Sequence, residues 1–96
     1  MDNEVLIIWA PVAEINYNKI LRYIIKNWSV NAAIEFDKKT NVLLSHIVNN
    51  NKICPKSNIT NFRKCVITSQ SSLIYRINKS SIEIIDVISN YSQHKY

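Results

Sequence analysis

The chain has 96 residues, of which 47% are hydrophobic and 20% are charged, with a formal net charge of +5 at pH 7 and a pI near 9.4. These values predict one globular domain over residues 1–96 and exclude a disordered chain. The basic charge favours an anionic partner (nucleic acid, an acidic protein or a membrane surface), and a merely soluble basic domain is the alternative. No apolar run approaches the roughly 20 residues of a membrane span and no signal peptide is visible, so we expect a cytoplasmic protein without a membrane partner.

The first part of the chain predicts a strand followed by a helix. Residues 4–9 (EVLIIW) form a short apolar run that is typical of a strand. Pro11 suits a first helical turn, because its missing N–H group would have no helical acceptor there. Apolar side chains then recur at helical spacing and predict a helix over about residues 11–28. They are Ala13, Tyr17, Ile20, Leu21, Ile24 and Trp28.

A second helix is expected to follow at once. Ser29 is a favourable N-cap residue, and the asparagines at 49–51 predict the end of the helix. The short break between the two helices implies an antiparallel hairpin. The apolar stripe of the second helix contains Ala33, Phe36, Thr40, Leu43, Leu44 and Ile47.

Residues 61–90 predict a three-stranded antiparallel meander. Three runs rich in β-branched and aromatic residues are separated by the polar turns SQSS and NKSS. With the first strand, this gives an α+β fold: two layers, with a helical hairpin packed on a mainly antiparallel four-stranded sheet in the order β-α-α-β-β-β. By alternation, Leu73, Tyr75 and Ile77 share one face, and Ile74 and Arg76 lie on the other. In the last strand, Ile82, Ile84 and Ile88 are expected to oppose Glu83, Ile85 and Val87.

The sequence contains no pattern for a metal or cofactor site. Cys54 and Cys65 match no zinc spacing and the chain has two histidines, so we expect both thiols to be reduced and structural. There is no glycine-rich phosphate loop and no hydrolase or metalloprotease motif. We therefore expect no cofactor and no metal.

Cations and phenols near the sheet are the candidate functional groups, because they can hold RNA phosphates and stabilise charge on a transferring phosphoryl oxygen. For Arg63, a phosphate clamp and a strand-end residue paired with an acid have equal weight. For Arg76, pairing with Glu83 or Asp86 is favoured. The terminal imidazole and phenol are proton-transfer or base-stacking groups, or else part of a disordered end. The whole set is Lys52, Lys56, Arg63, Lys64, Arg76, Tyr91, His94, Lys95 and Tyr96. Tyr75 and Trp28 are assigned to the core, and His46 to the surface.

Several short motifs in order resemble the RelE/ParE superfamily of bacterial type II toxins, over nearly the whole chain. They are W-x-P-x-A at Trp9, Pro11 and Ala13, I-L-x-Y-I at Ile20–Ile24, the residues Trp28, Ala33 and Phe36, N-F-R at Asn61–Arg63, and S-L-I-Y-R-I at Ser72–Ile77. The resemblance implies a compact toxin whose helical hairpin packs on a twisted sheet. It also implies a cognate antitoxin, often acidic, that wraps the toxin with a segment that folds on binding and forms a toxin–antitoxin hetero-oligomer.

The superfamily divides by target. RelE-like members cleave mRNA on the ribosome with arginines, lysines and a tyrosine of the concave sheet face, and ParE-like members inhibit DNA gyrase without such chemistry. The first helix is more similar to the ParE branch, whereas Arg63 matches the arginine that RelE-like nucleases carry on the second strand. Tyr91 stands where many members of both branches have an arginine. The ending at His94–Tyr96 loosely resembles the His-Tyr terminus of YoeB-like nucleases, with Lys95 interrupting it.

The resemblance leads us to expect a toxin that inhibits translation by ribosome-dependent, metal-independent mRNA cleavage. Arg63, His94 and Tyr96 would be its catalytic residues. The residues expected to bind RNA are Lys52, Lys56, Lys64, Tyr91 and Lys95. A non-enzymatic inhibitor of DNA gyrase is the alternative, and an inactive or antitoxin-bound member is the third hypothesis.

Overall fold

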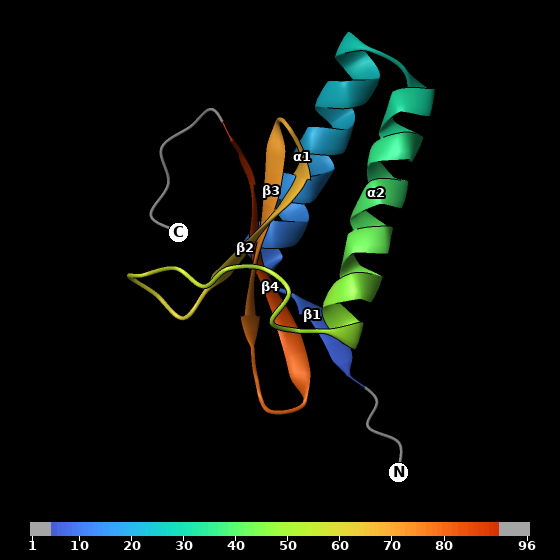
Figure 1. Cartoon of the computed structure of the whole chain (residues 1–96). Helices are drawn as coiled ribbons and strands as arrows, with labels where there is room; N and C mark the ends of the chain where they lie inside the picture. Colours follow the sequence, from blue (N-terminus) through green and yellow to red (C-terminus); the bar gives the residue numbers. More distant parts are fainter. Residues whose placement is uncertain (1–4, 91–96) are drawn as a thin grey trace.

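The computed structural model describes residues 5–90, which form two helices and one four-stranded sheet (Figure 1). In chain order the elements are β1 (Leu6–Trp9), α1 (Pro11–Asn27), α2 (Val30–Asn49), β2 (Arg63–Thr68), β3 (Ser71–Ile77) and β4 (Ser81–Ser89). Both helices lie on the same face of the sheet (Figure 1). The predicted α+β class and element order are confirmed.

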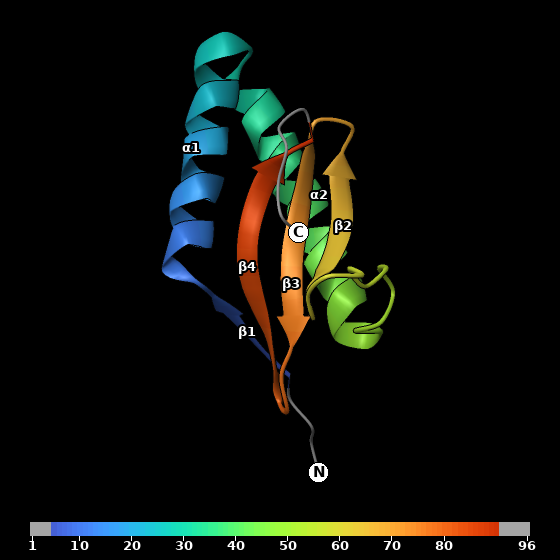
Figure 2. The ribbon, with the colours of Figure 1, turned by 90° about the vertical axis from the view of Figure 1, so that its left-hand side faces the viewer.

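The sheet has the strand order β1-β4-β3-β2. Strands β2, β3 and β4 form the predicted antiparallel meander, and β1 adds parallel to β4 at the edge of the sheet. Figure 2 shows the face of the sheet that the helices leave uncovered, with β4, β3 and β2 side by side. The sheet is therefore mixed but mostly antiparallel.

The helix ends follow the local chemistry of the chain. Pro11 occupies the first position of α1. At the start of α2, the Ser29 Oγ accepts a hydrogen bond of 3.0 Å from the Ala32 backbone N–H, which satisfies one of the unpaired donors of the first turn. The helix ends at Asn49, where the asparagine run begins. Both predicted helices are confirmed. Neither helix within residues 5–90 is long and apolar enough to cross a membrane.

Tyr17 joins the two helices. Its ring stacks on Phe36 with 5.8 Å between centroids, and its hydroxyl donates a 2.5 Å hydrogen bond to Asp37 Oδ1. Burial, together with this hydrogen bond to the carboxylate, raises the pKa of Tyr17 well above its ordinary value. The phenol therefore remains a protonated donor, and the helical hairpin is held closed by a polar contact as well as by packing.

The core lies between the helical hairpin and the sheet. Each large aliphatic or aromatic side chain that leaves water there contributes roughly 1.5–3 kcal/mol to stability. The buried cluster contains Ala13, Leu44, Ile47, Cys65, Leu73, Tyr75, Ile82, Ile84 and Val87. Ile77 packs against this cluster as a partly buried side chain, so the expected common face of Leu73, Tyr75 and Ile77 is confirmed.

A β-bulge changes the predicted pattern of β4. Ile74 pairs with Asp86 but the next residue, Tyr75, pairs with Ile84, so Ile85 has no counterpart on β3. One inserted residue shifts the alternation of every later side chain by one position. Val87 consequently joins the core cluster, whereas Ile88 pairs with Ser72 on the other face of the sheet. The expectation that Ile88 shares a face with Ile82 and Ile84 was wrong.

Trp28 is not a core residue, contrary to the prediction from the helical stripe. It caps the C-terminus of α1, and 60% of its surface is exposed. The indole borders an open cavity between the helical hairpin and the β2–β3 turn, so the core does not enclose it. Its ring instead lies against Tyr23, with 5.9 Å between centroids.

Candidate functional site

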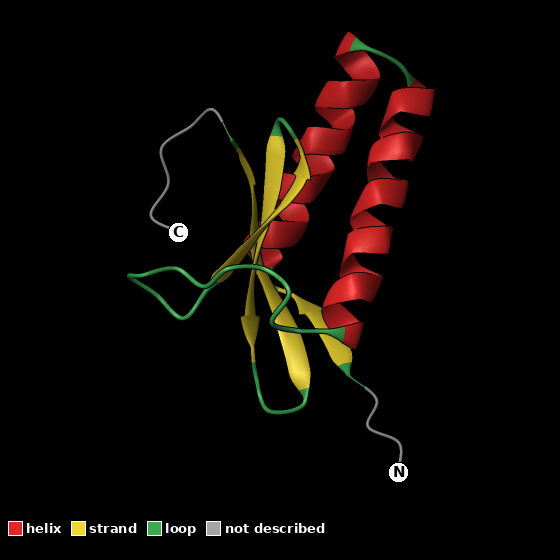
Figure 3. Ribbon diagram, in the orientation of Figure 1, coloured by secondary structure: helices red, strands yellow, loops and turns green. Residues whose placement is uncertain are grey.

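The segment between α2 and β2, residues 50–62, determines the position of the candidate residues; we call it the connector. It leaves the helix layer and passes to the side of the sheet away from the helices (Figure 3). A disulfide joins Cys54 of the connector to Cys65 of β2, with 5.4 Å between the Cα atoms. The expectation of two reduced thiols was therefore wrong. The connector folds back beside β2, and the separation of 11 residues gave no indication of this approach.

Two neighbouring side chains of the sheet also hold the connector by its carbonyl groups. Arg63 and Tyr75 are cross-strand partners, so they share a face of the sheet. The Tyr75 hydroxyl donates a 2.7 Å hydrogen bond to the Asn51 carbonyl, and Arg63 Nη1 donates one of 2.7 Å to the Cys54 carbonyl. Burial raises the pKa of Tyr75, so its hydroxyl stays a donor. The connector is thus fixed against the start of β2.

This arrangement brings three cations together around a cavity of about 350 Å³. We call it the cationic hollow; it is lined by Lys56, Asn61, Arg63, Arg76, Ile77 and Asn78. Lys56 also forms an isolated antiparallel bridge with Arg63. Guanidinium and ammonium groups that converge from the connector, β2 and β3 are the donors that bind phosphate oxygens.

The position of Arg63 agrees only in part with each of the two hypotheses from the sequence, a phosphate clamp and a strand-end residue paired with an acid. It is half-buried at the first residue of β2, and its Nη1 atom is bonded to a backbone carbonyl. A carbonyl group fixes the guanidinium without neutralising its charge. Arg63 is therefore oriented toward the connector and keeps its positive charge beside the hollow, as an anion-binding group requires.

Arg76 pairs with Glu83, as predicted, and its guanidinium carbon lies 6.0 Å from the centre of the Phe62 ring. The hydrogen bond from Arg76 is the main reason that the pKa of Glu83 is lowered. However, Arg76 also lines the cationic hollow, and its Nε atom is buried with no hydrogen-bond partner among the residues that the structure describes. The sequence placed Arg76 among the candidate cations and favoured its ion pair; in the structure Arg76 makes that pair and also lines the hollow.

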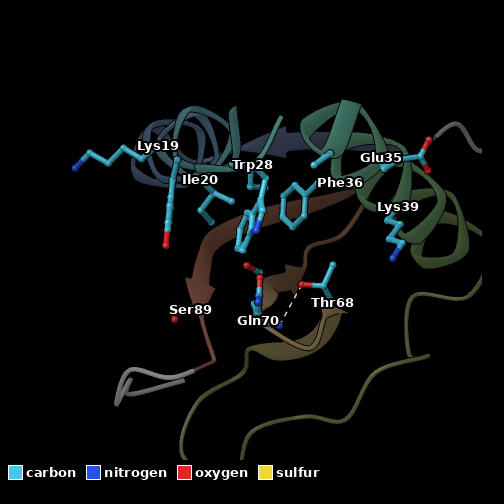
Figure 4. A pocket seen from close by; sticks show the side chains of 13 residues that line it. Lys19, Ile20, Trp28, Glu35, Phe36, Lys39, Thr68, Gln70 and Ser89 are labelled. Atoms are coloured by element: carbon cyan, nitrogen blue, oxygen red, sulfur yellow. Dashed lines mark hydrogen bonds between the residues drawn. The ribbon is translucent and has the colours of Figure 1, made fainter. Parts of the chain in front are cut away.

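A second cavity, of about 620 Å³, lies between the helical hairpin and the β2–β3 turn (Figure 4). We call it the apolar groove. Ile20, Trp28 and Phe36 point into it, and Lys19 and Lys39 extend from its helical rim (Figure 4). Its other lining residues are Tyr23, Ile24, Ala32, Glu35, Thr68, Gln70, Ser71 and Ser89. The groove and the cationic hollow lie at opposite ends of the β2–β3 pair.

No family model and no curated protein matches the sequence. Solved structures do match. The chromosomal ParDE TA system from P. aeruginosa superposes with a TM-score of 0.76 at 12% identity, over 92% of this chain and 98% of that chain. The YoeB dimer from Staphylococcus aureus has a TM-score of 0.66 at 24% identity, over 92% and 99%, respectively. The heterotetrameric YoeB-YefM toxin-antitoxin complex of that organism has a TM-score of 0.63 at 24% identity, over 92% of this chain and 99% of that chain.

The chain has the RelE/ParE toxin fold. The resemblance inferred from its short motifs is thereby confirmed at the level of the fold, and the helical hairpin on one sheet face is the shared architecture.

Of the residues predicted for RNA binding or catalysis, the structure brings together Arg63 and Lys56. Lys52 and Lys64 are exposed and lie outside the lining of the hollow. Because Lys64 is adjacent to Arg63 in β2, it points to the opposite face of the sheet. Tyr91, His94, Lys95 and Tyr96 lie outside the described residues, so their predicted roles stay predictions. His46 is exposed, as expected.

Proposed function

We propose that this chain is the toxin of a type II toxin–antitoxin system and that it inhibits translation by cleaving mRNA on the ribosome. The observation that supports this function is the cationic hollow, where Arg63, Arg76 and Lys56 converge on a space large enough for a phosphate group. Arg76 is paired with Glu83, whereas Arg63 and Lys56 repel one another unless an anion lies between them. An RNA phosphate supplies that charge, and we place the reaction in the cytoplasm, where mRNA is translated.

The proposed reaction needs no metal. The ribose 2′-hydroxyl attacks the adjacent phosphorus, the bond from phosphorus to the 5′-oxygen breaks, and a cyclic phosphate and a 5′-hydroxyl result. Arg63 and Arg76 would hold the non-bridging oxygens, where negative charge increases in the transition state. His94 and Tyr96 are the proposed groups for removing the proton from the 2′-oxygen and returning one to the 5′-oxygen.

We further propose a cognate antitoxin as the protein partner, in a toxin–antitoxin hetero-oligomer. The YoeB-YefM structure of the same fold is a toxin-antitoxin complex. In this chain, the apolar groove provides a surface for the apolar side of an amphipathic segment, and Lys19 and Lys39 at its rim favour acidic residues along the edge of that segment. The occupant we expect is an acidic antitoxin segment.

Inhibition of DNA gyrase without RNA cleavage is the second candidate function. It is favoured by the structural similarity to the ParDE system, whose TM-score of 0.76 exceeds the 0.66 of the YoeB dimer. In that case the toxin would act through a protein–protein surface, and the cationic hollow would have no catalytic role.

Controlled expression in bacteria distinguishes the two functions. We expect a rapid halt in protein synthesis, with cleaved transcripts recovered from ribosomes, because the hollow would act on mRNA. Co-expression of the proposed cognate antitoxin should restore growth. DNA damage with an SOS response, and intact transcripts, would contradict the nuclease and support gyrase as the target. Normal growth after confirmed expression of folded protein would contradict a toxin function altogether.

Replacing Glu83 with glutamine tests whether Arg76 contributes to RNA binding. Glu83→Gln removes the carboxylate that pairs with Arg76, and the freed guanidinium gains a phosphate contact. We expect tighter binding of single-stranded RNA at low salt, and a plot of log K against log salt that is steeper by about 0.7. Titrations at several salt concentrations measure both quantities.

Glu35→Gln is the matched control for this experiment, because Glu35 is also paired with a cation, Lys38, but lies on α2 away from the hollow. Both variants change the net charge by the same amount. Equal salt slopes for Glu83→Gln and Glu35→Gln would show that the effect comes from net charge, and Arg76 would then have no specific role.

A further inference from the structure

The Cys54–Cys65 disulfide lies directly beside the cationic hollow. Cys54 supplies the carbonyl that orients Arg63, and Lys56, two residues further along, lines the hollow itself. At the other end of the bond, Cys65 is two residues from Arg63 and is fixed in the core with 1% exposure. The bond therefore joins the connector to the sheet beside the hollow.

We propose that this disulfide is a redox switch: a dithiol reductant opens it, loosens the connector and weakens the binding of RNA phosphate in the cationic hollow. The inference depends on the proposed function of the hollow as an RNA site. Disulfides are rare in a reducing cytoplasm, and those that form there are usually transient or redox-sensing. For a protein that acts on mRNA, a disulfide at the site is therefore better explained by regulation than by permanent stabilisation.

The exposure of the two cysteines indicates the course of reduction. Cys54 is half-buried whereas Cys65 is fully buried, so a thiolate of the reductant attacks the Cys54 sulfur. The sulfur–sulfur bond breaks and Cys65 leaves as a thiolate. The second thiol of the reductant then attacks the sulfur that the reductant contributes to the mixed disulfide, which releases the Cys54 thiolate and a cyclic disulfide. Two electrons pass from the dithiol to the protein, and the cysteine thiolates take up two protons.

Reduction affects the two cysteines differently. Cys65 remains in place, because its strand is paired with β3 and its side chain packs in the core as a small apolar group. Without the disulfide, the connector near Cys54 is held by the packing of Cys54 against the core and by hydrogen bonds to the sheet, including the 2.7 Å contact with Arg63 and a 3.3 Å contact from the Lys64 N–H to the Pro55 carbonyl. Segments held by few, partly exposed hydrogen bonds open locally without global unfolding. Lys56 would then leave the hollow, and Arg63 would lose its fixed orientation.

The switch can be tested on the full-length oxidised protein before and after treatment with dithiothreitol. Backbone hydrogen exchange reports on the connector through the amides of Ser57 and Lys64, which bond to Phe62 and Pro55 within it. Fluorescence anisotropy with a short single-stranded RNA reports on the hollow. We expect reduction to accelerate exchange at both amides and to weaken RNA binding about tenfold, which corresponds to the loss of one charge-assisted contact.

Cys54→Ser provides the matched control, because it removes the bond and leaves the buried Cys65 unchanged. We expect this variant to behave as the reduced protein does and not to respond to dithiothreitol. Unchanged amide exchange on reduction of the wild type would overturn the switch, and so would faster exchange with unchanged RNA affinity. If neither redox state binds RNA, the proposed RNA site is wrong, and a switch acting on RNA binding is overturned with it. Faster connector exchange would then identify the bond as a structural link only.

Discussion

Replacing Arg63 with alanine is expected to lower the rate of RNA cleavage by about 10²–10³-fold, the usual cost of removing one preorganised group that stabilises transition-state charge. Growth arrest on expression should therefore disappear. The fold should persist, because the connector keeps its disulfide and the hydrogen bond from Tyr75 to Asn51. Growth after induction and cleavage of ribosome-bound mRNA measure the effect, and circular dichroism verifies the fold.

Two further variants control for this result. Arg63→Lys keeps the charge but loses the planar pair of donors, so we expect intermediate activity. Lys26→Ala removes one positive charge from the exposed surface of α1, outside both cavities, and should remain fully toxic. Full toxicity of a folded Arg63→Ala protein would exclude this arginine from the mechanism. It would leave the hollow without its central residue.

Replacing Tyr75 with alanine is expected to produce the largest loss of stability, about 3–5 kcal/mol, as for other large aromatic side chains in protein cores. Tyr75 has no exposed surface and is one of the largest buried side chains. Its removal leaves a cavity in the core cluster and a connector carbonyl without its donor. Because a small domain has a total free energy of unfolding of only about 5–15 kcal/mol, this substitution would remove a large part of it. Denaturant unfolding measured under oxidising conditions provides the free energy.

Tyr75→Phe separates packing from hydrogen bonding. It keeps the ring and removes only the hydroxyl that bonds to the Asn51 carbonyl, so we expect a loss of about 1–3 kcal/mol. If the phenylalanine variant is as unstable as the alanine variant, attachment of the connector, and not the aromatic ring in the core, determines stability at this position. Wild-type stability of Tyr75→Ala would contradict the central place of this residue in the core.

Periodicity predicted the elements of this fold because each helix buries one stripe and alternate side chains of the strands face the helices. The positions from Ala33 to Ile47 show this directly, as does the pair Leu73 and Tyr75. The prediction failed where an element departs from its ideal period. The bulge at Ile85 depends on how β4 fits β3, and the exposure of Trp28 depends on the open cavity between the hairpin and the β2–β3 turn. Neither property is encoded in a local window of sequence.

The candidate site was less predictable than the fold, because it depends on an irregular segment. Arg63 was identified from its resemblance to a family residue, and Lys56 from its charge. The path of the connector decides which other cations join them, and that path is set by the Cys54–Cys65 bond and by two side chains that bind its carbonyl groups. Arg76 was assigned to an ion pair, correctly but incompletely, because pairing with Glu83 does not prevent its guanidinium from facing a cavity.

The position of β1 has a consequence for how the protein is made. Its only paired neighbour among the described strands is β4, which the ribosome synthesises after all the other elements, and α1 also packs against β4. In the nascent polypeptide, β1 and α1 therefore cannot complete their packing until β4 has been synthesised. Translation that stops before Ser81 would yield an incomplete product without a closed core.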